Sequence, residues 1–275
     1  MGGQSTRATA ISADGSVVVG NIEIAGPGLV TFHVFRWTQS GGPKDLGVLG
    51  GTSAIAYCVS ADGKVLAGVI VFPDRSRHVF RWSERGGAED LATLGSEPIN
   101  SVSAVSADGS VLVGTMGQPR ATNVFRWTQS GGLENLGAFG GVSASASGVS
   151  ADGTKVVGTI QSANGSDLID HAFIWGTTGG LRDLGTLGGV ATISHGVSAD
   201  GAVIGGDIRI ASPTGKSAWH ALRWSQSRGP QDLGMFGSSI ATACCVSADG
   251  STIVGNYGFF GISPTGIFAS IARTQ

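Results

Sequence analysis

One tetrapeptide, Ser-Ala-Asp-Gly, occurs six times and limits the folds open to this chain more than any other feature. The copies lie 44 to 49 residues apart, and a glycine follows each aspartate by six residues. Their aspartates are Asp14, Asp62, Asp108, Asp152, Asp200 and Asp249. Self-similarity at a period of this length is typical of solenoids and propellers.

Two further motifs follow within each repeat. The first reads His-Val-Phe-Arg-Trp at residues 33–37 and 78–82. Copies at 123–127, 171–175 and 220–224 differ at one or two positions, and the copy at 266–270 lacks both His and Trp. The second motif, close to Asp-Leu-Gly-x-Leu-Gly, closes five repeats and starts at Asp45, Asp90, Asn135, Asp183 and Asp232.

Each repeat therefore contains four short segments rich in Val, Ile, Phe and Trp and bounded by turn residues, which predicts four strands, a to d. In the first repeat they are residues 6–12, 16–21, 33–38 and 45–49. Asp-Gly between strands a and b favours a two-residue type I′ hairpin. Four antiparallel strands in a repeat of about 45 residues are typical of a propeller blade.

The predicted fold is all-β: a six-bladed β-propeller with four antiparallel strands per blade and a three-stranded last blade. We expect a single domain over residues 1–275, with repeats at approximately 1–50, 51–96, 97–141, 142–189, 190–237 and 238–275. The last repeat ends after its third strand. That leaves an exposed strand edge, at which self-association between molecules is predicted.

Composition excludes several function classes. The formal net charge is −2 and only 13% of residues are charged, with no Lys/Arg cluster, so we expect no nucleic-acid partner. No apolar run is long enough to span a membrane, and the polar residues that open the sequence predict no signal peptide within it. The cysteines, Cys58, Cys244 and Cys245, lack metal-binding spacing, so neither a metal nor a cofactor is predicted.

The aromatic motif is expected to be structural. Its tryptophans predict core packing between blades, and its histidines, each on a different blade, predict backbone hydrogen bonds rather than a shared metal site. Arg36, Arg81, Arg126 and Arg223 are expected to pair across the c–d hairpin with Asp45, Asp90, Asn135 and Asp232. In the fourth repeat Ile174 replaces the arginine, which predicts weaker c–d pairing there.

The His-Ala/Val-Phe-x-Trp strand followed by Asp-Leu-Gly-x-Leu-Gly-Gly resembles the HAF-repeat family of probable extracellular bacterial repeat proteins. The resemblance covers nearly the whole chain, with five good copies and a degenerate sixth. Departures include Asn123 for His, Ile174 for Arg and Leu222 for Phe. The resemblance implies an extracellular or cell-surface location and brings no catalytic residues.

Candidate site residues come from the variable positions. The fifth residue before each aspartate differs between most repeats, unlike the small residues beside it, and is expected to lie at the mouth of a central channel; Tyr57 and His195 belong to this row, and Glu97 and Asn100 are predicted nearby. The b–c loops also vary in length and chemistry, and variable loops on a rigid scaffold often bind ligands. Among their aromatic residues, Phe72, Trp219 and Tyr257 are candidates for stacking on a sugar or a protein partner.

Three functions remain open. The first is a non-catalytic binding or adhesion module that recognises a protein or glycan through the b–c loops. The second is a glycan- or lactone-acting hydrolase at the channel mouth, although the a strands contain no acidic residue before the turn and a glycosidase needs two carboxylates. The third is a purely structural repeat domain. No catalytic or metal-binding residue is predicted.

Overall fold

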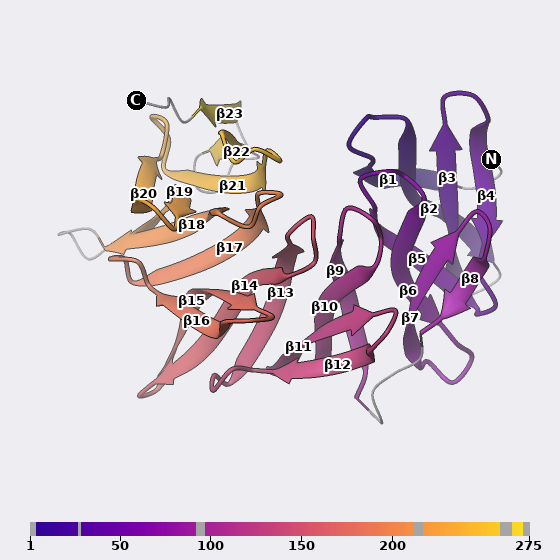
Figure 1. Ribbon diagram of the computed structural model, residues 1–275, viewed down its shortest axis with the longest axis horizontal. Coiled ribbons are helices and arrows are strands. Elements are labelled where there is room, and N and C mark those ends of the chain that lie inside the picture. Colours follow the sequence, from indigo (N-terminus) through magenta and orange to yellow (C-terminus); the bar gives the residue numbers. More distant parts are fainter. Residues whose placement is uncertain (1–3, 27–28, 92–96, 212–216, 259–265, 272–275) are drawn as a thin grey trace. The chain divides into compact units, whose positions relative to one another are not determined.

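A computed structural model describes the chain except for residues 1–3, 27–28, 92–96, 212–216, 259–265 and 272–275. The described residues form strands and turns only, in six separate sheets (Figure 1). Their contacts divide the chain into two compact units, Met1–Gly137 and Ala138–Gln275, with three sheets each. Among the described residues no helix could cross a membrane.

The first unit contains three four-stranded sheets, each an antiparallel meander in sequence order. The first sheet is β1 (Ser5–Ile11), β2 (Val17–Gly26), β3 (Leu29–Thr38) and β4 (Gly42–Gly47). The second is β5 (Ser53–Val59), β6 (Val65–Val71), β7 (Arg77–Ser83) and β8 (Gly87–Asp90). The third is β9 (Ile99–Val105), β10 (Val111–Gln118), β11 (Ala121–Thr128) and β12 (Gly132–Gly137).

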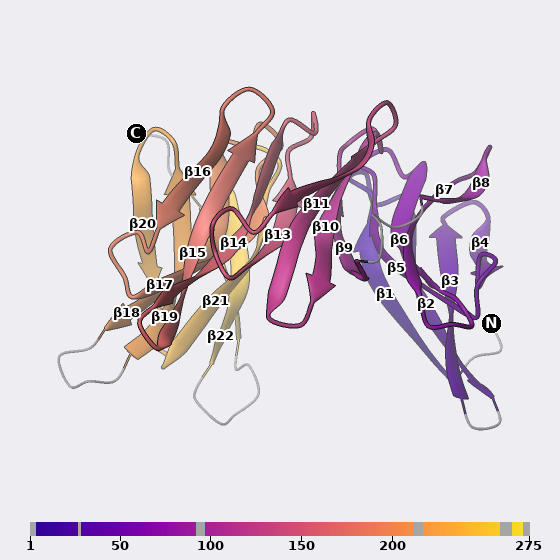
Figure 2. The same ribbon diagram turned by 90° about the horizontal axis from the view of Figure 1, so that it is seen from below.

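The second unit repeats the meander pattern (Figure 2). It ends with a three-stranded sheet. The fourth sheet is β13 (Ser143–Val149), β14 (Lys155–Asn164), β15 (Asp167–Gly176) and β16 (Gly180–Gly185). The fifth is β17 (Ala191–Val197), β18 (Val203–Ala211), β19 (Ser217–Ser225) and β20 (Gly229–Gly234). The sixth is β21 (Ile240–Val246), β22 (Thr252–Gly258) and β23 (Gly266–Ile271). The predicted strand content of each repeat is confirmed.

Apolar clusters join successive sheets inside each unit. In one cluster, Val17 and Val34 of the first sheet pack with Leu66, Phe80 and Trp82 of the second. Trp82, Trp127 and Trp224 are buried, as predicted for the aromatic motif, whereas Trp37 and Trp175 are half-buried. The glycine six residues after each aspartate allows strand a to approach closely and, in every sheet but the fifth, where Leu222 replaces it, the Phe ring as well. At Gly68 a Cβ atom would meet the Ile55 carbonyl oxygen and the Phe80 ring.

The Ser-Ala-Asp-Gly segment is a wider loop than the predicted two-residue type I′ hairpin. In the second repeat β5 ends at Val59 and β6 begins at Val65. Gly63 alone in this loop has a positive φ, of 69°. The buried Ser60 hydroxyl donates to Asp62 Oδ1 (2.6 Å) and accepts from the Val65 amide (3.0 Å). Hydrogen bonds of the serine and aspartate side chains therefore stabilise this longer loop in place of the predicted two-residue turn.

These loops also fasten neighbouring sheets to one another. The Ala13 amide donates to the Ala61 carbonyl (3.0 Å), and the Ala61 amide donates to the Ala107 carbonyl (3.1 Å). In the second unit, Ala151 and Ala199 amides donate to the carbonyls of Ala199 and Ala248, each at 2.8 Å. We call this end of each sheet, with its a–b loops, the turn end.

The predicted arginine–aspartate pairs are wrong. The register places Asp45 opposite Phe35, on the face that carries His33, whereas Arg36 lies opposite Lys44. The aspartate pairs with the histidine in four sheets, which also corrects the prediction of backbone partners for these histidines. The Nδ1-to-Oδ2 distances are 3.0 Å for His33–Asp45, 2.9 Å for His78–Asp90, 3.1 Å for His171–Asp183 and 2.8 Å for His220–Asp232.

The arginines reach the next sheet instead. Their side chains donate to the glycine carbonyl of the following Ser-Ala-Asp-Gly loop, in the pairs Arg36–Gly63 (3.4 Å), Arg81–Gly109 (3.2 Å) and Arg223–Gly250 (3.3 Å). In the fourth sheet, where Ile174 replaces the arginine, Lys155 Nζ donates to the Asp200 carbonyl at 3.0 Å and the Gly201 carbonyl at 3.5 Å. The c–d ladder there has the same register as that of the first sheet, and the predicted weakening stays a prediction.

Most residues predicted as b–c loops are in strands. Strands β2 and β3 pair as far as Gly26 and Leu29, and β14 and β15 pair as far as Asn164 and Asp167. The variable segments are therefore extended β-hairpins of different lengths, and we call this end of each sheet the hairpin end. Parts of the predicted loops at 27–28, 212–216 and 259–265 lie outside the described residues.

Candidate functional site

The variable row of strand a coincides with a β-bulge in every sheet. Each a–b ladder shifts register at the fifth residue before the aspartate, which is left without a cross-strand partner. The bulged residues are Thr9, Tyr57, Ser103, Ser147, His195 and Cys244. A residue at a bulge has no cross-strand partner, and its side chain points in a different direction from those beside it. The residues at these positions can therefore vary without disturbing the hydrogen bonds of the sheet.

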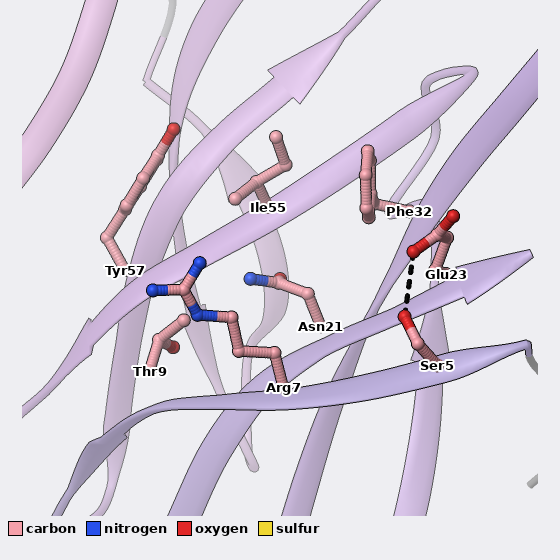
Figure 3. A pocket seen from close by; sticks show the side chains of 8 residues that line it. All are labelled: Ser5, Arg7, Thr9, Asn21, Glu23, Phe32, Ile55 and Tyr57. Atoms are coloured by element: carbon pink, nitrogen blue, oxygen red, sulfur yellow. Dashed lines mark hydrogen bonds between the residues drawn. The ribbon is translucent and has the colours of Figure 1, made fainter. Parts of the chain in front are cut away.

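The bulges of the first two sheets open onto a pocket of about 420 Å³, shown in Figure 3. Strands β1, β2 and β3 form one wall, and β5 forms the other. Its lining residues are Ser5, Arg7, Thr9, Asn21, Glu23, Phe32, Ile55 and Tyr57. The pocket runs from Ser5, Glu23 and Phe32 at the hairpin end to Thr9 and the predicted Tyr57 at the bulges. Phe32 lies in β3.

Cross-strand register explains why these side chains share one face. Ser5 lies opposite Glu23, and Glu23 lies opposite Phe32. Arg7 lies opposite Asn21 in the next same-face row. The pocket wall is therefore built on paired strands, which position side chains more rigidly than loops do.

Sequence reasoning missed one functional position in strand b. It is the residue directly after the glycine that follows each Ser-Ala-Asp-Gly aspartate by six residues. Asn21 Oδ1 accepts from the Ala56 amide (2.8 Å), and its Nδ2 donates to the Ala56 carbonyl (3.2 Å). Thr159 and Asp207, at the same position, accept from the amides of Ser194 (3.2 Å) and Ala243 (2.8 Å). The side chains at this position hydrogen-bond to the first strand of the next sheet. The sequence signal for them was a polar residue that recurs directly after that glycine.

The predicted His195 belongs to a different cluster, in the second unit. Its Nε2 lies 2.8 Å from Asp207 Oδ2, and Asp207 is buried. Cys244 accepts from Asn256 Nδ2 at 3.2 Å. Burial raises the pKa of the Cys244 thiol, and the charges of Cys245 and Asp207 raise it further. These surroundings favour the protonated thiol, whereas a nucleophilic cysteine requires the thiolate.

The remaining predicted residues are dispersed. Glu97 and Asn100 are half-buried around the start of β9 and do not line the Tyr57 pocket. Phe72 packs against His78, with ring centroids 4.6 Å apart. Trp219 lies in β19 opposite Arg209, and Tyr257 lies in β22 with its ring 6.5 Å from that of Phe236. Trp219 and Tyr257 are therefore strand residues, whereas Phe72 lies in the loop between β6 and β7, as predicted.

The chemistry of the pocket suits binding better than hydrolysis. Glu23 is the single carboxylate among its lining residues, whereas glycoside hydrolysis uses a pair. Across the described parts of the chain, no group of three or more His, Cys, Asp or Glu side chains could hold a metal ion. Phe32, Ile55 and Tyr57 provide apolar surface, and Arg7 and Glu23 provide charges of opposite sign.

Comparison with solved structures defines the fold class. The chain is similar to the β-propeller domain of the Trilobed protease from Pyrococcus furiosus, with a TM-score of 0.67 and 10% identity over 100% of this chain and 83% of that one. It is also similar to TolB from Acinetobacter baumannii, with a TM-score of 0.57 and 16% identity over 90% of this chain. For Pyrococcus horikoshii acylaminoacyl peptidase the values are 0.64 and 10% over 92% of this chain.

The protein therefore has a β-propeller fold, and its six sheets are the blades. It spans 59% of the TolB chain and 43% of the acylaminoacyl peptidase chain. No family model matches the sequence, and no curated protein matches it significantly. The resemblance to HAF repeats thus continues to rest on the sequence motifs alone.

Proposed function

We propose that this propeller is a non-catalytic binding module that recognises a glycan through the pocket between its first two blades. The observation that carries the proposal is the division of the pocket into an apolar and a polar side. Phe32, Ile55 and Tyr57 can cover the C–H face of a pyranose ring, while Arg7 and Glu23 can bond its hydroxyl groups. Its volume of about 420 Å³ lies within the range of small-molecule sites.

The bulge row supports the same proposal. Thr9 and Tyr57 both lie at bulges, so one end of the pocket is formed by residues that have no cross-strand partner. Other blades carry different residues at these positions, which would give this pair of blades a specificity that its neighbours lack. The extracellular or cell-surface location and self-association through the edge of β23 remain predictions from the sequence.

Binding of the full chain to a glycan array, followed by calorimetric titration of the best glycan, tests the proposal. We expect Tyr57→Ala to weaken binding at least tenfold, because aromatic stacking supplies much of the contact area. Trp219→Ala, at the hairpin end of the fifth blade, is the matched control and should bind as the wild type does. Melting temperatures of both variants separate lost binding from lost folding.

A chain that binds no glycan on the array would overturn this function and leave a structural repeat domain. Equal losses in the Tyr57 and Trp219 variants would also contradict the assignment of the pocket.

A further inference from the structure

The polar side chains that line the Tyr57 pocket differ in how many of their hydrogen-bonding atoms already have a partner within the protein. Both polar atoms of the Asn21 amide bond the Ala56 backbone, and Thr9 Oγ1 donates to the Ala56 carbonyl at 3.0 Å. These two side chains hold β5 against the first blade. They therefore have little capacity left for a ligand.

Arg7 is the opposite case. Its side chain is exposed, and within the described structure its guanidinium makes no hydrogen bond or ion pair. Figure 3 shows it extending toward Thr9 and Tyr57 and away from Glu23. The guanidinium, with five N–H donors and one positive charge, is thus directed toward the Thr9 and Tyr57 end of the pocket.

Glu23 is placed at the other end of the same wall. Its Oε2 accepts from Ser5 Oγ at 2.7 Å, which leaves Oε1 open to a further donor. Glu23 and Arg7 are diagonal neighbours on adjacent strands, but the Arg7 guanidinium extends away from the Glu23 carboxylate (Figure 3). The pocket consequently presents a free cation toward Thr9 and Tyr57 and a hydrogen-bond acceptor at its other end, where Phe32 lies beside Glu23. Ile55 contributes apolar surface from the opposite wall.

We infer that the glycan bound here is acidic and places a sugar carboxylate on the Arg7 guanidinium. This inference rests on the proposed glycan-binding function. The planar guanidinium matches a carboxylate through two parallel hydrogen bonds. Glu23 accepts from a hydroxyl group of the same or the next residue. Because Glu23 is itself negative, a singly charged carboxylate fits the pocket better than a doubly charged phosphate.

Matched pairs of oligosaccharides that differ only in the carboxylate test the inference: galacturonate oligomers against their methyl esters, and glucuronate-containing oligomers against the glucose forms. We expect the full chain to bind the acid of at least one pair ten or more times tighter than its neutral partner. Arg7→Gln should abolish that preference. Arg209→Gln, which removes an exposed arginine at the hairpin end of the fifth blade, should leave it unchanged.

The outcomes separate the two proposals. Equal binding of acid and neutral partners, with loss of both in Tyr57→Ala, overturns the acidic ligand and leaves glycan binding intact. A preference that survives in Arg7→Gln overturns the role of Arg7. Failure of every acidic and neutral oligomer, together with a negative glycan array, overturns both proposals. The preference should also weaken as salt is added, since Arg7 is exposed.

Discussion

At the turn end of the blades the same Ser-Ala-Asp-Gly loop recurs in all six repeats, whereas at the hairpin end the side chains change from repeat to repeat. The turn end holds buried serines, alanine-to-alanine hydrogen bonds between blades, and Arg or Lys side chains on the next loop's carbonyls. The Tyr57 pocket starts at the hairpin end, with Ser5, Glu23 and Phe32, and extends along the strands to the bulges at Thr9 and Tyr57. Blade-to-blade fastening at one end leaves the other free to vary in chemistry.

The largest loss of stability is expected from Gly63→Ala at the turn end. Gly63 has φ +69°, and a Cβ atom there would lie 2.5 Å from Val17 Cγ2 of the first blade. Strain and overpacking together should cost about 3 kcal/mol in the free energy of unfolding. Gly42→Ala is the control: φ is +65° but nothing lies within 4 Å, so we expect about 1 kcal/mol. Equal losses in urea titrations would refute inter-blade packing as the cause.

The substitutions Ser60→Ala and Ser53→Ala compare the two ends of a single strand, β5. Ser60→Ala removes a buried hydroxyl and leaves the Val65 amide without its partner, which should cost about 1–3 kcal/mol. At the hairpin end, Ser53 Oγ accepts from the Phe32 amide (2.9 Å) but is half-buried, so water can replace it. Ser53→Ala should therefore cost less than about 1 kcal/mol in the same unfolding assay. A larger loss of stability for Ser53→Ala than for Ser60→Ala would contradict the proposal that the turn end contributes more to stability than the hairpin end.

The fourth blade shows that the fastening can be made by another residue. Lys155→Met should cost about 1 kcal/mol by removing the bond to the Asp200 carbonyl. Adding Ile174→Arg restores the arginine found in the first, second, third and fifth blades, and should recover at least half of the loss. Thermal unfolding of the single and double variants measures this. No recovery in the double variant would mean that the lysine and the arginine are not equivalent.

Acid should weaken the turn end through its carboxylates. Hydrogen bonds from the Ser12 and Ser16 side chains and the Ser16 amide hold the pKa of Asp14 at about 2. An unfolded aspartate has a pKa of about 3.9, so the folded carboxylate contributes stability above pH 4 that is lost as the pH falls through 2. The stability difference between wild type and Asp14→Asn should thus shrink from pH 6 to pH 2. A difference independent of pH would exclude this carboxylate as its source.

The smallest effect is expected at the hairpin end. Glu23→Gln keeps a side-chain oxygen that can accept from Ser5, at an exposed position. Its free energy of unfolding should stay within about 0.5 kcal/mol of the wild type. A destabilisation comparable to that of Ser60→Ala would show that Glu23, in the pocket wall, also contributes to holding the fold together.

Strand content and repeat number could be predicted because turn residues and apolar alternation recur six times. The partners of Asp45 could not be predicted, because they depend on the register of β4 against β3, and a shift near Val34 sets that register. The Asp-Gly pair was also ambiguous. It suits a two-residue turn, but Ser60 adds hydrogen bonds that stabilise a longer loop.

The site was predicted in part. The variability of the row containing Tyr57 was visible in the sequence, whereas the bulge that frees this row is a property of the a–b ladder. Arg7 and Glu23 escaped notice because their proximity to Tyr57 arises from packing between two blades rather than from a motif.

Amide and arginine side-chain chemical shifts of the full chain, followed during titration with galacturonate and glucuronate oligomers, test the division between the two ends most directly. The account predicts that shifts change for Arg7, Glu23, Phe32 and Tyr57, while the six Ser-Ala-Asp-Gly loops remain unperturbed. Changes centred on those loops, or a saturable binding event that leaves the Arg7 side chain unaffected, would contradict it.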